Sequence, residues 1–192
     1  MILIRADANP VIGMGHIMRC LSIADAFHEA EKKVAFVLAD HQVEELVHNR
    51  GFETIVLNSF YDDMESELDF WPKSSPELIL VDSYYVTDYY LRSLRKRSKL
   101  VYVDDLAAFP YTVDVLINYN AYGPEMDYVG LYQNHPPILL LGVTYAPLRE
   151  MFRNVPRREP REDVQDILFS TGGSDDLHLA LKLIEMKPEG FN

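Results

Sequence analysis

Residues 2–38 read ILIRADANPVIGMGHIMRCLSIADAFHEAEKKVAFVL. The continuous apolar run Ile2–Ala6 predicts a strand buried on both faces, as in a parallel sheet between two layers of helices. Apolar residues then recur at three- and four-residue spacing, which predicts a helix over about His16–Glu31. A second apolar run, Val34–Leu38, follows the helix. This strand–helix–strand order is typical of an open, doubly wound α/β fold.

The same alternation continues along the chain. Val43 and Val47 mark a second helix that ends at Gly51, and Thr87 can cap a third. Further apolar runs predict strands at Thr54–Leu57, Leu78–Val81, Leu100–Val103, Val113–Ile117 and Ile138–Leu141. We therefore expect the α/β class, with a doubly wound, mostly parallel sheet of Rossmann-like arrangement.

The charge and cysteine content exclude several classes of partner and site. Among 192 residues, Lys and Arg number 18 and Asp and Glu number 30, which gives a net charge of −12. This balance argues against a nucleic-acid surface or an anionic membrane partner, since both require clustered cations. The single Cys20 cannot form an internal disulfide. With no membrane-length apolar run and no signal-peptide pattern, we expect a cytoplasmic protein.

The alternation is interrupted at residues 154–163, where Pro156, Pro160 and charged residues indicate a linker. We expect residues 1–153 to form a first Rossmann-like domain. Residues 164–192 would then open a second, truncated domain, with a strand at Asp166–Phe169 and a helix at about Leu177–Met186.

Candidate site residues follow the first strand, because ligands of parallel α/β sheets bind beyond the carboxyl ends of the strands. Gly13 and Gly15 let the backbone turn sharply and approach a ligand. His16 begins the predicted helix, and Arg19 lies one turn further on. The positive end of the helix dipole favours the neutral imidazole that a general base requires. A glycine turn beside an incidental histidine explains the pattern about equally well.

Several cofactor and metal motifs are absent. A dinucleotide fingerprint needs a third glycine where Met18 stands, and no Gly-Lys-Ser/Thr follows the loop. The histidines lack the spacing of a zinc site. The acidic run at residues 62–67 indicates a solvated helix or loop more than a cation site. We therefore expect no cofactor and no metal.

Three further loops carry polar residues. Asp82, Ser83 and the tyrosines at 84–85 could orient a sugar or a water, although Asp82 could equally cap a helix while the tyrosines pack. Asp104–Asp105 is better interpreted as a structural turn than as a metal site. The small residues at 170–175 again separate a predicted strand from a helix, and could face a phosphate or a sugar.

Together these segments resemble the bacterial nucleotide-sugar hydrolases of pseudaminic acid biosynthesis, which are related to spore-coat polysaccharide protein G. Residues 5–21 have their form Arg-x-Asp, a short spacer, Gly-x-Gly-His, two residues and Arg-Cys-Leu. Further matching segments are VDSYYV (81–86), VDDLA (103–107), LLGVTYAPLREMF (140–152) and ILFSTGGSD (167–175).

The resemblance implies one half of a two-domain GT-B architecture, in which Rossmann-like domains face each other. It implies metal-free hydrolysis of UDP-2,4-diacetamido-2,4,6-trideoxy-β-L-altropyranose, with inversion and release of UDP. His16 would be the general base that activates water, and Tyr84 would lie at the sugar as the second catalytic-site residue. The substrate-binding residues expected are Asp7, Gly13, Gly15, Arg19, Asp82, Gly172, Gly173, Ser174 and Asp175.

Two other functions fit the same segments. One is a glycosyltransferase of this architecture, and the other is a sugar- or nucleotide-binding module without catalysis. Hydrolysis requires the His16 imidazole to face an open crevice, whereas a buried ring favours the binding module. Because the resemblance places most uridine and diphosphate contacts in a second domain, we expect the 192-residue chain to be inactive by itself.

Overall fold

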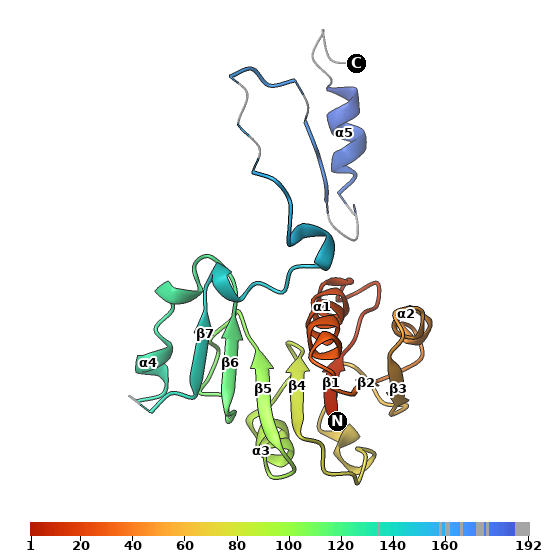
Figure 1. The fold of residues 1–192 in the computed structure, drawn as a ribbon, viewed down its shortest axis with the longest axis vertical. Helices are drawn as coiled ribbons and strands as arrows, with labels where there is room; N and C mark the ends of the chain where they lie inside the picture. The colour runs from red at the N-terminus through yellow and green to blue at the C-terminus, as the bar shows by residue number, and fades with distance from the viewer. Residues whose placement is uncertain are drawn as a thin grey trace.

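The computed structural model describes residues 1–133, 135–157, 159, 162–165, 167–171, 175 and 177–186. Seven parallel strands form one sheet in the order β3-β2-β1-β4-β5-β6-β7 (Figure 1). The strands are β1 (Ile2–Ala6), β2 (Val34–Leu38), β3 (Glu53–Val56), β4 (Leu78–Asp82), β5 (Lys99–Val103), β6 (Val115–Asn118) and β7 (Ile138–Leu141). The predicted fold class is confirmed, and each expected strand of the sheet is present with ends shifted by at most two residues.

Helices cover both faces of the sheet, as continuous apolar strands require. One face packs against α1 (Gly15–Glu29) and α2 (Glu44–Asn49). The other packs against α3 (Asp88–Arg95), α4 (Tyr128–Leu131) and the 3₁₀ turn η1 (Ser66–Asp69). Shorter 3₁₀ turns are η2 (Gly123–Glu125), η3 (Val143–Tyr145) and η4 (Glu150–Phe152).

The first face is covered unevenly. Its helices α1 and α2 pack over β1, β2 and β3. Val115 and Ile117 of β6 point to this same face and are only partly buried. The sheet therefore keeps a partly uncovered apolar surface on the side of β5, β6 and β7.

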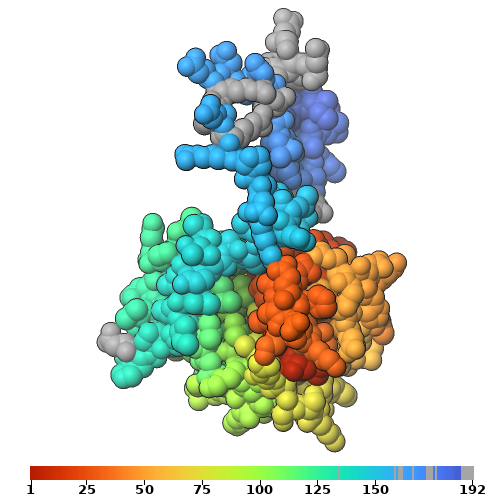
Figure 2. Space-filling view, in the orientation of Figure 1, coloured from red at the N-terminus to blue at the C-terminus, as the bar shows by residue number. Residues whose placement is uncertain are grey.

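The C-terminal segment departs from its predicted form. A strand was expected at Asp166–Phe169, but residues 167–169 form none, and Leu168 is 94% exposed. These residues pair with no strand of the sheet, so they lack the hydrogen bonds that define a strand. The predicted helix is present as α5 (Leu179–Glu185). Figure 2 shows this segment projecting from the packed body formed by the sheet and its helices.

A buried ion pair joins β1 to η1. The Arg5 side chain is fully buried and donates from Nε and Nη2 to the two carboxylate oxygens of Glu67, at 2.8 and 2.7 Å. Ser59, Trp71 and Tyr90 also donate to the Glu67 carboxylate. The interpretation of residues 62–67 as a solvated acidic run is therefore wrong for Glu67, because a buried guanidinium needs an anionic partner.

Replacing Glu67 by Ala is expected to destabilise the chain by about 3–5 kcal/mol, because the Arg5 charge would remain buried with half of its partners removed. Urea denaturation at neutral pH measures this loss. Glu45→Ala, on the exposed side of α2, is the matched control and should change stability by no more than about 0.5 kcal/mol. Equal stability of the two variants would contradict the structural role of Glu67.

Candidate functional site

His16 and Asp82 meet at the carboxyl edge of the sheet. His16 is the second residue of α1, which follows β1, and Asp82 is the last residue of β4, which pairs with β1. The His16 Nδ1 atom lies 2.7 Å from Asp82 Oδ1. The predicted loops after β1 and β4 therefore form a single cluster.

Arg19 completes this cluster from the next turn of α1. Its guanidinium donates hydrogen bonds to both carboxylate oxygens of Asp82. Nη1 also donates to the Tyr119 hydroxyl, at 3.0 Å, and the guanidinium lies over the Tyr119 ring. The loop after β6 is thereby tied to the same carboxylate, through a residue that the sequence analysis did not single out.

The Asp82 carboxylate is buried, yet it remains ionised at neutral pH. Burial raises its pKa, but hydrogen bonds and charge from Arg19 and His16 outweigh burial and hold the pKa below the ordinary value of 3.8. The neighbouring Cys20 thiol lies 3.5 Å from Asp82 Oδ2. Burial raises the thiol pKa well above 9.0, so Cys20 stays protonated and is unsuited to act as a nucleophile.

The Asp82 contact defines the tautomer of His16. An ionised carboxylate only accepts hydrogen bonds, so the 2.7 Å contact places a proton on Nδ1. Arg19 Nη2 also lies 2.9 Å from this nitrogen, but a protonated Nδ1 cannot accept, so Nη2 donates to Asp82 Oδ1. Neutral His16 therefore carries its free lone pair on Nε2, which is the nitrogen available to take a proton.

The His16 ring is covered, contrary to the open crevice that a catalytic base requires. His16 is 4% exposed. The Tyr84 ring lies edge-on to it, with ring centroids 4.8 Å apart and an interplanar angle of 79°. Tyr84 itself is 47% exposed, and its hydroxyl donates to Asp105 Oδ2 at 2.9 Å. Burial, reinforced by Asp105, raises the Tyr84 pKa to about 12, so the phenol stays protonated.

The two carboxylates after β5 behave differently. Asp104 accepts from the backbone N–H groups of Leu106 and Ala107 and from the Tyr128 hydroxyl, which agrees with the predicted structural turn. Asp105 instead reaches Tyr84. Both Asp105 and Tyr119 follow carboxyl ends of parallel strands, and that position is the signal by which the sequence could have identified them.

The remaining predicted site residues lie in varied surroundings. Asp7 is buried, pairs with Arg5 and accepts from the Ala39 N–H, so its carboxylate serves the packing of β1 and β2. Gly13 has a φ of +71°, a conformation that favours glycine, and its N–H closes a turn onto Asn9. Gly15 begins α1.

The last predicted loop is only partly described. Gly172, Gly173 and Ser174 lie outside the described residues. Asp175 accepts from the backbone N–H groups of Leu179 and Ala180, at 2.7 and 3.0 Å. It thus binds the first turn of α5, as a helix-capping carboxylate does.

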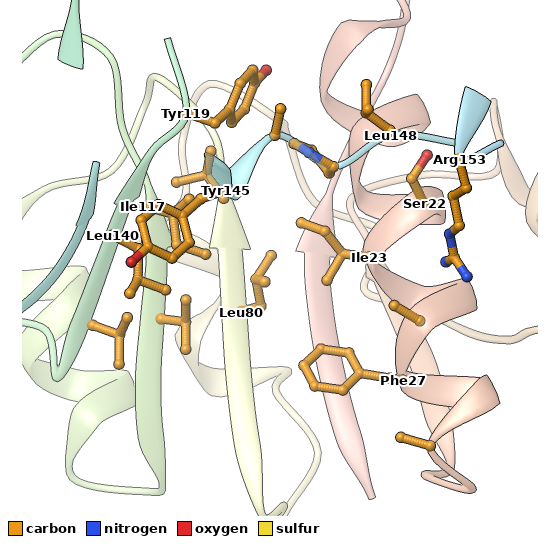
Figure 3. Close-up of a pocket in the computed structure, with 17 residues that line it drawn as sticks. Ser22, Ile23, Phe27, Leu80, Ile117, Tyr119, Leu140, Tyr145, Leu148 and Arg153 are labelled. Carbon is orange, nitrogen blue, oxygen red and sulfur yellow. The ribbon is translucent and has the colours of Figure 1, made fainter. Parts of the chain in front are cut away.

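Two of the pockets beside α1 differ in their lining. One, of about 620 Å³, lies at the N-terminal end of the helix and is lined by Gly15, Arg19, Ser22 and Arg149 together with apolar residues. The other, of about 790 Å³, lies on the uncovered sheet face (Figure 3). Its lining is almost entirely apolar, and its Arg153 guanidinium is bound to Glu29. The pocket beside the helix terminus is therefore the better suited to a charged ligand.

Neither a membrane helix nor a metal cluster is found in the part of the chain that the structure describes. None of its helices is long and apolar enough to cross a bilayer. No three His, Cys, Asp or Glu side chains of these residues gather in a way that could hold a metal ion.

The fold and this cluster define an α/β protein of Rossmann-like arrangement, with a His–Asp–Arg cluster at the carboxyl edge of its parallel sheet. No protein-family model matches the chain. It is 28% identical over 190 residues to the UDP-2,4-diacetamido-2,4,6-trideoxy-β-L-altropyranose hydrolase of Campylobacter jejuni, covering 98% of this chain and 66% of that protein. This distant similarity supports membership of that hydrolase's family or of a related one.

A second relative is an uncharacterised protein of Methanocaldococcus jannaschii. It is 24% identical over 204 residues, covering 100% of this chain and 41% of its own length. The chain therefore spans just under two thirds of one relative and about two fifths of the other.

The depressed pKa of Asp82 predicts how stability depends on acid. At neutral pH the carboxylate is ionised in both the folded and the unfolded chain, so its stabilisation is fully present. As pH falls below about 3.8, the unfolded chain takes up the proton first and this stability is lost. The Asp82→Asn variant lacks the titrating group. Its stability deficit against wild type should therefore be large at about pH 6 and should narrow at about pH 3.

Urea midpoints of the two proteins at these pH values measure the deficit. Asp62→Asn, an exposed carboxylate, serves as the control and should match wild type throughout. The two pH values, about 6 and about 3, lie on either side of the ordinary carboxylate pKa. A stability deficit that stays constant between them would show that the Asp82 charge does not stabilise the fold.

Proposed function

We propose that this chain forms part of a nucleotide-sugar hydrolase that releases UDP from a UDP-diacetamido-trideoxyhexose with inversion, in pseudaminic acid or surface-polysaccharide biosynthesis. The observation that carries the proposal is the 2.7 Å contact between His16 Nδ1 and the ionised Asp82, which leaves Nε2 as a base. The distant similarity to the Campylobacter jejuni hydrolase supports the choice of substrate.

In this mechanism His16 Nε2 removes a proton from a water as the water oxygen attacks the anomeric carbon. The bond between that carbon and the UDP oxygen breaks, and the electron pair leaves with UDP. Asp82 stabilises the imidazolium that forms, and Arg19 holds Asp82 in place. Since UDP is already a good leaving group, one base, a positioned water and dipoles that stabilise the departing charge are sufficient.

The pocket at the N-terminal end of α1 suits the leaving diphosphate. Free backbone N–H groups at a helix N-terminus and the helix dipole both favour an anion. Arg149, on the facing segment, adds a positive charge to this pocket. We assign Gly13, Gly15 and Arg19 to this side of the substrate, and Tyr84 to the sugar side. Asp82, whose side chain is fully buried, would act on the substrate through His16. Asp7 supports the loop from below through its contacts with Arg5 and Ala39.

The GT-B arrangement is part of the proposal. Residues 1–153 would form the first domain, and residues 154–163 the linker. Residues 164–192, with Gly172, Gly173, Ser174 and Asp175, would open the second domain, which faces the first across the cleft. The exposure of the described apolar residues from Val155 to Met186 supports this assignment, because such side chains normally pack within a domain.

A binding module without catalysis is the second candidate. The observation that favours it is the burial of His16 under Tyr84, since a covered base cannot reach water. The hydrolase requires the Tyr84 side chain to move aside when substrate enters, whereas the binding module does not.

In the full-length protein, His16→Asn should lower UDP release by about 10² or more, the usual loss for a general base. Affinity for the UDP-sugar and the fold should remain near wild type. Coupled detection of UDP measures turnover, and calorimetry measures binding. His28→Asn, on the exposed side of the same helix, is the control.

Three results separate the candidates. Turnover of His16→Asn within about tenfold of wild type would exclude His16 as the base. Binding of the UDP-sugar by the wild-type protein without UDP release would favour the binding module. Sugar transfer to an acceptor in place of water would favour a glycosyltransferase.

A further inference from the structure

We propose that Asp105 is a positioning residue that holds the Tyr84 side chain over His16, so that a single side-chain hydrogen bond keeps the base covered. The inference rests on the proposed function only for the role of His16 as a base. The hydrogen bond itself joins the loop after β4 to the loop after β5, two loops that the sequence analysis treated separately.

Both ends of this hydrogen bond stand on fixed backbone. The turn at Asp105 is held by Asp104, which binds the N–H groups of Leu106 and Ala107. The backbone before Tyr84 is held by the Tyr102 hydroxyl, which donates to the Ser83 carbonyl at 2.9 Å. Since both turns are anchored independently, the Tyr84 side chain can rotate away from His16 without movement of the sheet.

The Asp105 carboxylate is only partly satisfied. Oδ2 accepts from Tyr84, but Oδ1 is buried and has no hydrogen-bond partner among the described residues. A buried carboxylate oxygen without a partner is costly, and such groups in native structures often serve function more than stability. The arrangement is explained if the role of the Asp105 carboxylate is to accept the hydrogen bond from the Tyr84 hydroxyl.

Tyr84 has little else to hold it over His16. Its ring is 47% exposed, so packing restrains it weakly. Its hydroxyl remains protonated at neutral pH and is therefore always able to donate to Asp105. The edge-on contact with the His16 ring adds a second, smaller restraint.

The test measures access to His16 and needs no substrate. Diethylpyrocarbonate reacts with the free imidazole nitrogen, and peptide mass spectrometry gives the rate at each histidine separately. In the wild-type chain His16 should react more slowly than the exposed His28. Asp105→Ala should accelerate the reaction at His16 by roughly tenfold, as loss of a hydrogen bond to a carboxylate implies. Tyr84→Phe, which keeps the ring and lacks the hydroxyl, should do the same.

Two control variants isolate the hydrogen bond. Asp105→Asn keeps an acceptor oxygen for the Tyr84 hydroxyl and should react nearly as slowly as wild type. Asp62→Ala removes an exposed carboxylate elsewhere and should change nothing. General unfolding would also expose His16, whereas His28 is exposed already. The urea midpoint of each variant is therefore measured as well and must match that of the wild-type chain, and the His28 rate corrects for reagent concentration.

Either of two results would overturn the inference. One is a His16 rate within twofold of wild type in both Asp105→Ala and Tyr84→Phe, against the roughly tenfold change expected. The other is a rise in Asp105→Asn as large as that in Asp105→Ala. Because the modification rate is independent of turnover, failure of the hydrolase proposal would appear separately, as normal access to His16 without UDP release.

Discussion

The buried carboxylate of Asp82 is the interaction on which the rest of the site depends. A charge inside the protein must be paired. The Asp82 carboxylate is surrounded by three donors from one helix, which are His16, Arg19 and Cys20. The carboxylate therefore fixes the first two turns of α1 against the end of β4. It also sets the tautomer of His16 and the direction of the Arg19 guanidinium. The same carboxylate therefore holds α1 against β4 and leaves His16 Nε2 able to take a proton.

Much of the fold could be predicted from the sequence because parallel strands covered on both faces are continuously apolar. Local spacing also identified His16 and Arg19 on one side of a helix, and the strand-end rule drew attention to Asp82. The partnership of Arg5 with Glu67 could not be predicted, since 62 residues separate them and an acidic run is usually solvated. The covering of His16 depends on a tyrosine rotamer, which no sequence pattern specifies.

The covered base and the proposed chemistry are compatible if the site has a closed and an open form. In the closed form Tyr84 shields the imidazole from solvent, and the Asp82–His16–Arg19 cluster is complete without a ligand. Preorganisation of this kind leaves little to rearrange when a substrate enters, apart from the tyrosine side chain. The arrangement also explains why a histidine of this type can be buried and still be suited to proton transfer.

The apolar pocket beside α1 has a practical consequence for the isolated chain. Its lining of aliphatic and aromatic side chains favours hydrophobic association between molecules, whereas the net charge of −12 makes two molecules repel each other. Added electrolyte shortens the range of that repulsion, to about 3 Å at 1 M, while leaving the apolar attraction in place or strengthening it. Dilute buffers should therefore keep the chain dispersed, and salting should drive its molecules together through this face.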